Sequence, residues 1–286
     1  MNGRARAALI ALALVLSGCG REEPTETPLT GSIVEYGRTA SGAPLRGALY
    51  RPAGPGPFPV LLYAHGSAPG SLSNEAFEAV APALTSRGWA LFAPYRRGQG
   101  LSGDAGSYVR DEVAAARSEG GADQAQARLA RLLSEDHMAD QAQAFAWLSS
   151  QGYVDRRRIA AMGNSFGGIV ALLSAERLGI CAAVDAAGAA EIWGEAPAIR
   201  ALMTRSATRA RAPVLFVQAE NDFDLAPSRT LHAAMRQAGK PAEIRLYPPF
   251  GATARDGHAF AYRGVSVWAR DVHAFLDRSC PSADRS

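Results

Sequence analysis

Short apolar runs alternate with longer stretches of helical character along most of this chain. The apolar runs fall at 60–64, 89–93, 159–162, 182–185, 214–218 and 243–247. The helical stretches fall at 74–86, 166–178, 227–238 and 265–278. Because the apolar runs are continuous rather than alternating with polar residues, they are typical of strands buried on both faces. The pattern predicts an α/β fold with a mostly parallel sheet and helices on both faces.

Three segments depart from this alternation. Residues 32–35 and 45–50 predict an opening antiparallel hairpin. Residues 108–150 predict two helices broken around Glu119-Gly120-Gly121, the first of them a solvated surface helix. Residues 191–210 predict a further helical insertion, which would lie near the entrance of a site at this sheet.

The N-terminal residues predict export. Arg4 and Arg6 precede an apolar stretch at 7–16, which is too short to span a bilayer as a mature helix. It ends in Leu16-Ser17-Gly18-Cys19, which resembles the lipobox of bacterial lipoproteins. That resemblance implies a signal peptide at 1–18, a lipid anchor at Cys19 and a periplasm-facing protein held at a bacterial membrane. An ordinary secretory signal with a chance cysteine is the alternative.

Residues 19–31 are expected to form a flexible tether, since they are rich in Glu, Pro and Thr. Residues 32–280 are expected to form one α/β domain, followed by a tail at 281–286, because no linker divides them. The formal net charge of +3 gives no indication of nucleic-acid binding. No Cys/His cluster has metal-ligand spacing, so neither a metal nor an organic cofactor is expected. The oligomeric state stays open.

The segment Gly163-Asn164-Ser165-Phe166-Gly167 lies between an apolar run and a predicted helix. Strand, Gly-x-Ser-x-Gly and helix form the context of a nucleophile elbow, a turn in which the flanking glycines leave room for the backbone. Ser165 would then stand at a helix N-terminus, where the macrodipole and the N–H of Phe166 stabilise negative charge. The alternative is a glycine-rich turn that contains a serine by chance.

A serine hydroxyl is a weak nucleophile at neutral pH and needs a base, which a third group orients. In parallel α/β sheets such groups lie in loops after the strands. His258 meets this condition after the run at 243–247. The other histidines either fall in helical stretches or end a strand ahead of the serine: His137, His232, His273 and His65.

The acid is expected in the loop after the run at 214–218. Glu220, Asp222 and Asp224 are all candidates there. Each could instead be a solvated carboxylate or a cap of the helix that follows. Spacing alone leaves the choice open.

The order Ser165, acid, His258 resembles the α/β-hydrolases and, more narrowly, the dienelactone hydrolase family. It is also similar to the catalytic domains of prolyl oligopeptidases and acetyl xylan esterases. The resemblance runs from about Ser32 to Asp277 and rests on segments at 63–67, 94–100, 154–159, 163–167, 218–222 and 256–258. It implies an eight-stranded sheet. It also implies Asp222 as the acid, because these families place it four residues after the Gln at the strand end.

The resemblance further implies an oxyanion hole at His65-Gly66-Ser67, where the N–H of Ser67 would join that of Phe166. In these families the histidine of this segment shapes the loop, so His65 is not expected to act as a base. Tyr95-Arg96-Arg97 either binds a substrate carboxylate or belongs to a loop held by arginine hydrogen bonds.

This sequence departs from these families in two ways. Dienelactone hydrolases proper use a cysteine where Ser165 stands, so the activity that names the family is not implied. No propeller domain precedes residue 31, so the gating of prolyl oligopeptidases is not expected.

The expected function is cleavage of a small-molecule carboxylic ester through an acyl-enzyme, with membrane contact only through the N-terminal lipid. The alternatives are a prolyl oligopeptidase-like serine peptidase and a non-catalytic lipoprotein that keeps the fold.

Cys181 and Cys280 are the cysteines that remain after the lipobox. Both are expected at the amino ends of the strands, in a protein exported to an oxidising compartment, so a disulfide between them is possible. The alternative is one buried thiol and one thiol in a frayed tail.

Overall fold

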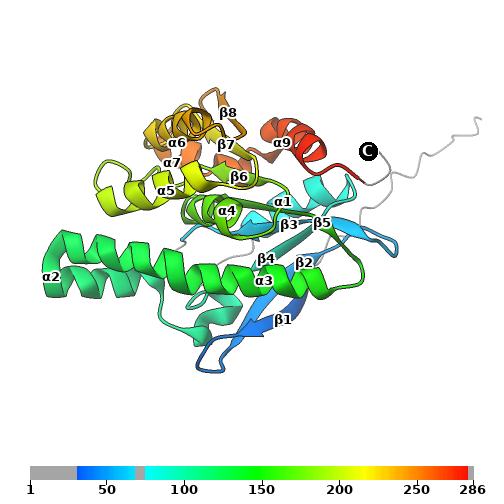
Figure 1. Cartoon of the computed structure of the whole chain (residues 1–286), viewed down its shortest axis with the longest axis horizontal. Coiled ribbons are helices and arrows are strands. Elements are labelled where there is room, and N and C mark those ends of the chain that lie inside the picture. The colour runs from blue at the N-terminus through cyan, green and yellow to red at the C-terminus, as the bar shows by residue number, and fades with distance from the viewer. Residues whose placement is uncertain (1–30, 68–74, 283–286) are drawn as a thin grey trace, which may run out of the picture.

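The chain folds around one eight-stranded sheet, ordered β1-β2-β4-β3-β5-β6-β7-β8. The computed structural model describes residues 31–67 and 75–282 (Figure 1), so the expected signal peptide, Cys19 and nearly all of the tether lie outside the described residues. The strands are β1 (Ser32–Arg38), β2 (Pro44–Tyr50), β3 (Phe58–Ala64), β4 (Ala90–Pro94), β5 (Val154–Asn164), β6 (Ala183–Ala186), β7 (Val214–Ala219) and β8 (Ala242–Tyr247).

The sheet is parallel from β4 to β8, and only the opening hairpin departs from this direction. β1 pairs antiparallel with β2, and β2 pairs antiparallel with β4. The pairs β3–β4, β3–β5, β5–β6, β6–β7 and β7–β8 are all parallel. β3, β4, β6 and β7 are buried at every position, as the continuous apolar runs predict. The predicted α/β fold with an eight-stranded, mostly parallel sheet is confirmed.

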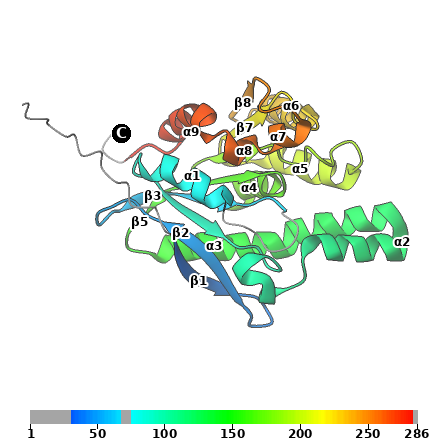
Figure 2. The same ribbon diagram turned by 180° about the vertical axis from the view of Figure 1, so that it is seen from behind.

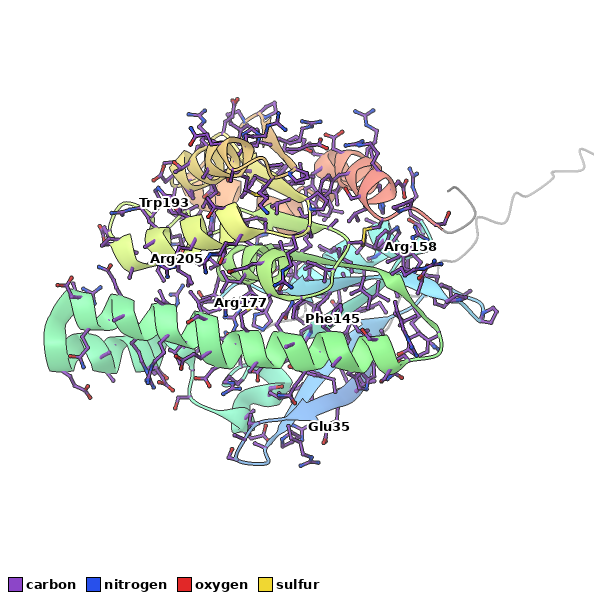
Figure 3. The ribbon with its side chains drawn as sticks, in the orientation of Figure 1. Glu35, Phe145, Arg158, Arg177, Trp193 and Arg205 are labelled. Carbon is purple, nitrogen blue, oxygen red and sulfur yellow. A yellow bond between two sulfur atoms is a disulfide. The ribbon has the colours of Figure 1, made fainter. Side chains whose placement is uncertain are left out.

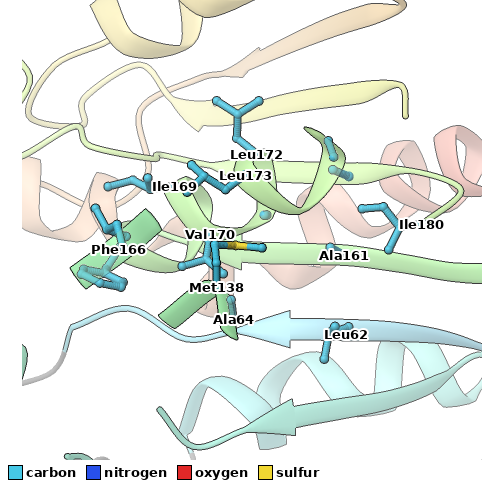
Figure 4. Packing of buried hydrophobic residues seen from close by; sticks show 14 of the residues in the cluster. Leu62, Ala64, Met138, Ala161, Phe166, Ile169, Val170, Leu172, Leu173 and Ile180 are labelled. Carbon is cyan, nitrogen blue, oxygen red and sulfur yellow. The ribbon is translucent and has the colours of Figure 1, made fainter. Parts of the chain in front are cut away.

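Helices cover both faces of the sheet. One face carries α3 (Met138–Ser150), α4 (Phe166–Arg177), α5 (Pro197–Arg209) and α6 (Ala226–Gln237). The other carries α1 (Glu75–Thr85), α8 (Phe260–Arg263) and α9 (Val265–Ser279), as the view from behind shows (Figure 2). On the first face, α4 is buried from Phe166 to Ala175 and packs on Ala64 and Ala161 of the strands (Figure 4). The central helix after β5 is therefore held rigidly against the sheet.

The segment after β4 forms a helical hairpin that projects from the body (Figures 1 and 2). A 3₁₀ helix (Gly100–Ala105) leads into α2 (Val109–Leu132), whose helical backbone is interrupted at Gly120 and Gly121, where the sequence predicts the break. A π-helical turn (Leu133–His137) then joins α2 to α3. The first leg is not the purely solvated helix that its composition predicts, because Val113 lines a cavity beside the sheet.

Cys181 and Cys280 are joined by a disulfide, with their Cα atoms 5.3 Å apart. Cys181 precedes β6 and Cys280 follows α9, so the bond lies at the amino ends of the parallel strands. Figure 3 shows it on the side of the molecule where Arg158 lies. Within residues 31–67 and 75–282, no helix is long and apolar enough to cross a membrane.

Candidate active site

Ser165 stands in a strained turn between β5 and α4. Its φ of 56° and ψ of −117° are rare for a residue with a side chain and cost about 1–3 kcal/mol. The turn needs glycines on both sides: a Cβ at Gly163 would lie 2.2 Å from the carbonyl oxygen of Gly167, and one at Gly167 would lie 1.8 Å from that of Ala64. The sequence thus folds into the elbow that its Gly-x-Ser-x-Gly spacing predicts.

The neighbouring strand β6 holds the elbow through its last residue. The N–H of Ser165 donates to the carbonyl oxygen of Ala186 across 2.9 Å. Asp185 lies just before it, fully buried, and accepts the N–H of Gly188 at 2.8 Å. Burial raises the pKa of Asp185 to about 7. The sequence does not by itself reveal this role of Asp185, although a carboxylate at the end of a buried apolar run is a visible signal.

His258 is oriented by a buried carboxylate. It ends α7 (Ala254–His258), beyond β8, and its Nδ1 lies 2.8 Å from Oδ1 of Asp222, in the loop after β7. The Asp222 side chain has 0% exposure and that of His258 has 14%. Oδ1 of Asp222 also accepts the N–H of Phe223 at 2.6 Å. With Nδ1 carrying the proton, Nε2 of His258 is left as the basic nitrogen.

The other two acid candidates have the alternative roles that the sequence predicts, one at the start of a helix and one as a solvated carboxylate. Oδ1 of Asp224 accepts the N–H of Ala226, the first residue of α6, at 2.8 Å. Glu220 is exposed, and its backbone N–H pairs with Tyr247. Of the three carboxylates, only Asp222 contacts the imidazole.

Ser165 and His258 are not hydrogen-bonded to one another within the described part of the chain. Nε2 of His258 is buried and has no hydrogen-bond partner there. The ring of Phe223 packs edge-on against the imidazole, with centroids 5.3 Å apart. Hydrogen bonds between a nucleophile and its base commonly tighten only when substrate is present, so the buried, free Nε2 is compatible with a base.

The candidate oxyanion-hole residues share a cavity with Ser165. Phe166 is the first residue of α4, so its N–H has no acceptor within the helix. Ser67 lies three residues after the end of β3, and its hydroxyl is 3.4 Å from a guanidinium nitrogen of Arg110. Ser67, Ser165 and Phe166 line the same cavity of about 420 Å³.

The walls of this cavity are mainly apolar and come from three elements. Val109, Val113 and Leu129 come from α2, Ile169 comes from α4 and Ile192 comes from the loop after β6, while the charged lining residues are Arg110, Arg117 and Glu191. The helical insertion predicted at 191–210 thus reaches the site through its first residues. A larger hollow of about 830 Å³ opens between the two legs of α2, but it contains none of the candidate site residues.

His65 and Arg96 join the loop after β3, which carries Ser67, to the loop after β4. Nε2 of His65 accepts the N–H of Arg96 at 3.0 Å, and its Nδ1 donates to the carbonyl oxygen of Gly66 at 2.7 Å. Burial lowers the pKa of His65 well below its usual value. Its neutral ring shapes the loop, as the family resemblance implies, and is not free to act as a base.

The arginines of the Tyr95-Arg96-Arg97 segment are occupied within the protein. The Arg96 guanidinium lies 3.8 Å from the centre of the Phe166 ring and donates to Gln99 at 3.1 Å. Arg97 forms a two-pronged pair with Asp140, at 2.7 and 2.5 Å. Of the two predicted alternatives, the loop held by arginine hydrogen bonds is the one that the structure contains.

His137 is a further residue whose place the sequence does not reveal. It ends the π-helical turn, is buried, and packs edge-on against Phe166 with centroids 5.2 Å apart. Burial lowers its pKa well below the usual value. The Phe166 ring thus contacts both a neutral imidazole and the Arg96 guanidinium.

No cluster of three or more His, Cys, Asp or Glu side chains in residues 31–67 and 75–282 has the arrangement of a metal site. The site therefore holds a serine in a strained turn, a histidine paired with a buried carboxylate, and two candidate N–H donors beside the serine. This set of groups suits acyl transfer.

Several solved structures share this architecture. An acylaminoacyl peptidase from Pyrococcus horikoshii aligns with a TM-score of 0.64 at 16% identity, over 89% of this chain and 42% of its own length. An esterase from Thermogutta terrifontis aligns with a TM-score of 0.62 at 18% identity, over 89% of this chain and 95% of its own. A Pyrococcus furiosus esterase aligns with a TM-score of 0.64 at 15% identity, over 91% and 96%. The chain therefore spans less than half of the peptidase and nearly all of each esterase.

At these identities the structural neighbours establish the α/β-hydrolase fold. A search of curated proteins by sequence finds no match. The family comparison is more specific, because residues 45–281 match the dienelactone hydrolase family. Since that match covers most of the sequence, the chain belongs to the dienelactone hydrolase family and is a hydrolase.

Proposed function

We propose that this protein is a serine hydrolase that cleaves carboxylic esters, with Ser165 as nucleophile, His258 as base and Asp222 as the orienting acid. One observation carries the proposal: the buried Asp222 carboxylate lies 2.8 Å from Nδ1 of His258. These two residues follow β7 and β8 of the sheet whose strand β5 leads into the strained turn at Ser165. A buried carboxylate in this position fixes the imidazole tautomer and stabilises the charged ring. The family match and the esterase neighbours support the same reaction class.

The reaction begins when the ester carbonyl enters the cavity beside Ser165. Oγ attacks the acyl carbon, and its proton passes to Nε2 of His258. The negative charge that develops on the carbonyl oxygen is stabilised by the N–H groups of Phe166 and Ser67. Such a donor is worth about 3 kcal/mol of transition-state stabilisation.

The tetrahedral intermediate then collapses. The imidazolium of His258 returns its proton to the departing alcohol, which leaves an acyl group on Ser165. Water attacks this acyl-enzyme with His258 again as base, and the released acid restores the free serine. Both half-reactions use the same proton-accepting nitrogen.

The shape of the cavity favours a small or medium-sized acyl group. Its volume of about 420 Å³ lies at the lower end of the usual range for ligand sites. Val113, Leu129, Ile169 and Ile192 supply apolar surface beside the nucleophile. An aliphatic acyl chain that lies between α2 and α4 would bury its methylene groups there.

A peptidase is the second candidate, supported by the likeness in fold to acylaminoacyl peptidases. Ester and amide substrates with the same acyl group separate the two proposals. We expect turnover of the p-nitrophenyl ester to exceed that of the matched p-nitroanilide by far more than their difference in intrinsic reactivity. Comparable enhancement of both over their uncatalysed rates would favour the peptidase.

The decisive test of the proposed nucleophile is covalent labelling with a fluorophosphonate probe. The wild-type protein should be labelled at Ser165, and Ser165→Ala should lose both labelling and hydrolysis of a p-nitrophenyl ester panel. The substitution removes one hydroxyl, so the thermal midpoint should stay within a few degrees of the wild type. Labelling of another serine in Ser165→Ala, or no labelling of the wild type, would contradict the proposal, and the latter would favour a non-catalytic protein.

We also propose that the protein is exported and acylated at Cys19, after removal of residues 1–18. The lipobox sequence Leu16-Ser17-Gly18-Cys19 is what supports this. Mass spectrometry of the mature N-terminus should find acyl groups on Cys19, and Cys19→Ala should give either an unprocessed precursor or a soluble protein. Several acyl chains give a stable anchor where one alone gives only marginal binding. Cleavage at any other residue would rule out the lipoprotein proposal.

A further inference from the structure

The surface at the amino ends of the parallel strands is strongly cationic. Its positive side chains lie at the starts of successive strands or, for the antiparallel β2, just after its end. We call them the basic face: Arg51, Arg87, Arg156, Arg157, Arg211 and Lys240. The five arginines are exposed and Lys240 is half-buried. The sheet topology thus gathers onto one surface charges that are spread along the sequence.

Few acids lie near this charge, and among the described residues Asp277, which lines a hollow with Arg87, forms no ion pair with it. Glu243 lies nearby but is already paired with Arg278, at 2.9 Å, and with Arg245, at 3.2 Å. Asp155 accepts the backbone N–H of Arg157 at 3.1 Å. Among the residues that the structure describes, no ion pair joins a basic-face side chain to a carboxylate. The charge of the basic face is therefore available to an external anionic partner.

The opposite end of the molecule carries charges of both signs. Arg110, Arg117 and Glu191 line the candidate active-site cavity, and Glu195 and Glu220 are exposed in loops at the carboxyl ends of the strands. An anionic surface would therefore attract the basic face more strongly than the end that carries the cavity, where acids and bases are mixed.

The chain enters the domain beside the basic face. Ser32 begins β1 and pairs with Leu49, next to Tyr50 at the amino end of the sheet. Fully extended, the residues between Cys19 and Ser32 reach at most about 45 Å. A lipid on Cys19 would therefore hold the domain within reach of the membrane from the side on which the basic face lies.

We propose that the basic face docks on a membrane surface of anionic phospholipids, with the candidate active-site cavity directed away from it. The inference rests on the proposed lipid anchor. Arginine and lysine side chains are attracted to anionic headgroups within about a Debye length, which is ~10 Å at 0.1 M salt. The anchor supplies proximity and the basic face supplies orientation, a combination of lipid and cationic surface that membrane-bound proteins commonly use.

The test uses the acylated full-length protein on vesicles with nitroxide-labelled headgroups. A fluorophore is attached through Ser86→Cys, an exposed position next to Arg87, or through Glu195→Cys at the opposite end. We expect the label at position 86 to be quenched more on vesicles that contain phosphatidylglycerol than on pure phosphatidylcholine. The difference should disappear at ~1 M salt, where the Debye length falls to about 3 Å. The label at position 195 should show no such increase.

Two charge-reversed double variants, one on the basic face and one away from it, provide the matched comparison. Arg156→Glu with Arg157→Glu should remove the added quenching at position 86. Arg131→Glu with Arg229→Glu makes the same change in net charge on exposed residues away from the basic face and should retain it. Equal quenching at position 86 on the two lipid compositions would overturn the proposal. An equal loss in both charge-reversed proteins would also overturn it.

Failure of the anchor itself would look different. A protein that does not float with neutral phosphatidylcholine vesicles lacks a working lipid anchor, which contradicts the anchoring proposal. The basic face alone still predicts flotation with phosphatidylglycerol vesicles at low salt, weakened about tenfold or more by Arg156→Glu with Arg157→Glu. Absence of that flotation as well would refute docking.

Discussion

The side-chain amide of Gln218 donates to Oδ2 of Asp222 across 2.8 Å, four residues along the chain. The same nitrogen donates to the carbonyl oxygen of Asp224 at 2.8 Å, and the hydroxyl of Ser228 donates to Oε1 of Gln218 at 2.7 Å. Gln218 thus holds the loop after β7 in the one shape that presents Asp222 to His258. The four-residue spacing between Gln218 and Asp222 has a structural cause, because the chain between them turns tightly enough for the amide to contact the carboxylate.

Asp222→Asn should lower kcat by about two to four orders of magnitude, because an amide at this position can hold the imidazole in the wrong tautomer. Asp224→Asn leaves the contact between Asp222 and His258 intact and keeps a side-chain oxygen for the N–H of Ala226, so stability should change by less than about 1 kcal/mol. Ester hydrolysis by the two purified proteins, with urea unfolding of each, measures both effects. If Asp224→Asn were the more damaging to activity, the acid would be assigned to the wrong residue.

The sequence predicts the parts of this site that local geometry controls. The elbow follows from Gly163 and Gly167, because any side chain there meets backbone atoms of the same turn or of β3. The conformation of the loop after β7 decides whether Asp222 or Asp224 faces His258. That conformation depends on the N–H of Asp222 reaching the carbonyl of Ala219 and on the Gln218 contacts. The residues alone therefore left the acid open, and the family resemblance decided it.

The parts that the sequence does not predict depend on contacts between distant segments. Arg96 meets Phe166 only because β3, β4 and β5 lie side by side, so neither residue signals the other in the sequence. Val113 looks like an isolated apolar residue in a polar helix until the hairpin places it over α4. Ser67 is identified by resemblance, and the structure adds only that it shares a cavity with Ser165.

Val113→Phe should shorten the acyl chains that the protein accepts, because the larger ring fills the wall of the cavity between α2 and α4. For a substrate that reaches this wall, the loss in kcat/KM should be about tenfold or more per excluded methylene, while the acetate ester is little affected. A panel of p-nitrophenyl esters of increasing chain length measures this profile. Ala115→Phe is the matched control, since Ala115 is exposed on the same helix and does not line this cavity. An unchanged profile in Val113→Phe would place the acyl group elsewhere.

Asp185 predicts a particular dependence of stability on pH. Its folded-state pKa is about 7, above the ordinary 3.8, so the folded protein binds a proton between these values that the unfolded chain releases. The contribution of this group to the free energy of unfolding should therefore fall as pH rises from about 4 to 7, by a few kcal/mol. Asp185→Asn keeps an acceptor for the N–H of Gly188 but does not titrate. Urea unfolding across this range should give a flatter profile for Asp185→Asn, and parallel profiles would show that Asp185 is ionised in both states.

The disulfide between Cys181 and Cys280 should contribute to stability without affecting catalysis. It closes a loop across a sequence separation of 99 residues, and restricting the unfolded chain over such a length is worth about 4 kcal/mol. Because the bond lies at the amino ends of the strands, opposite Ser165, Cys181→Ala with Cys280→Ala should leave kcat and KM for a p-nitrophenyl ester unchanged below the melting temperature. Denaturant unfolding of this double variant and of each single variant measures the loss. The single variants should lose about as much as the double, since either removes the bond. Alkylation of both thiols in the unreduced wild-type protein, or a double variant as stable as the wild type, would contradict this prediction.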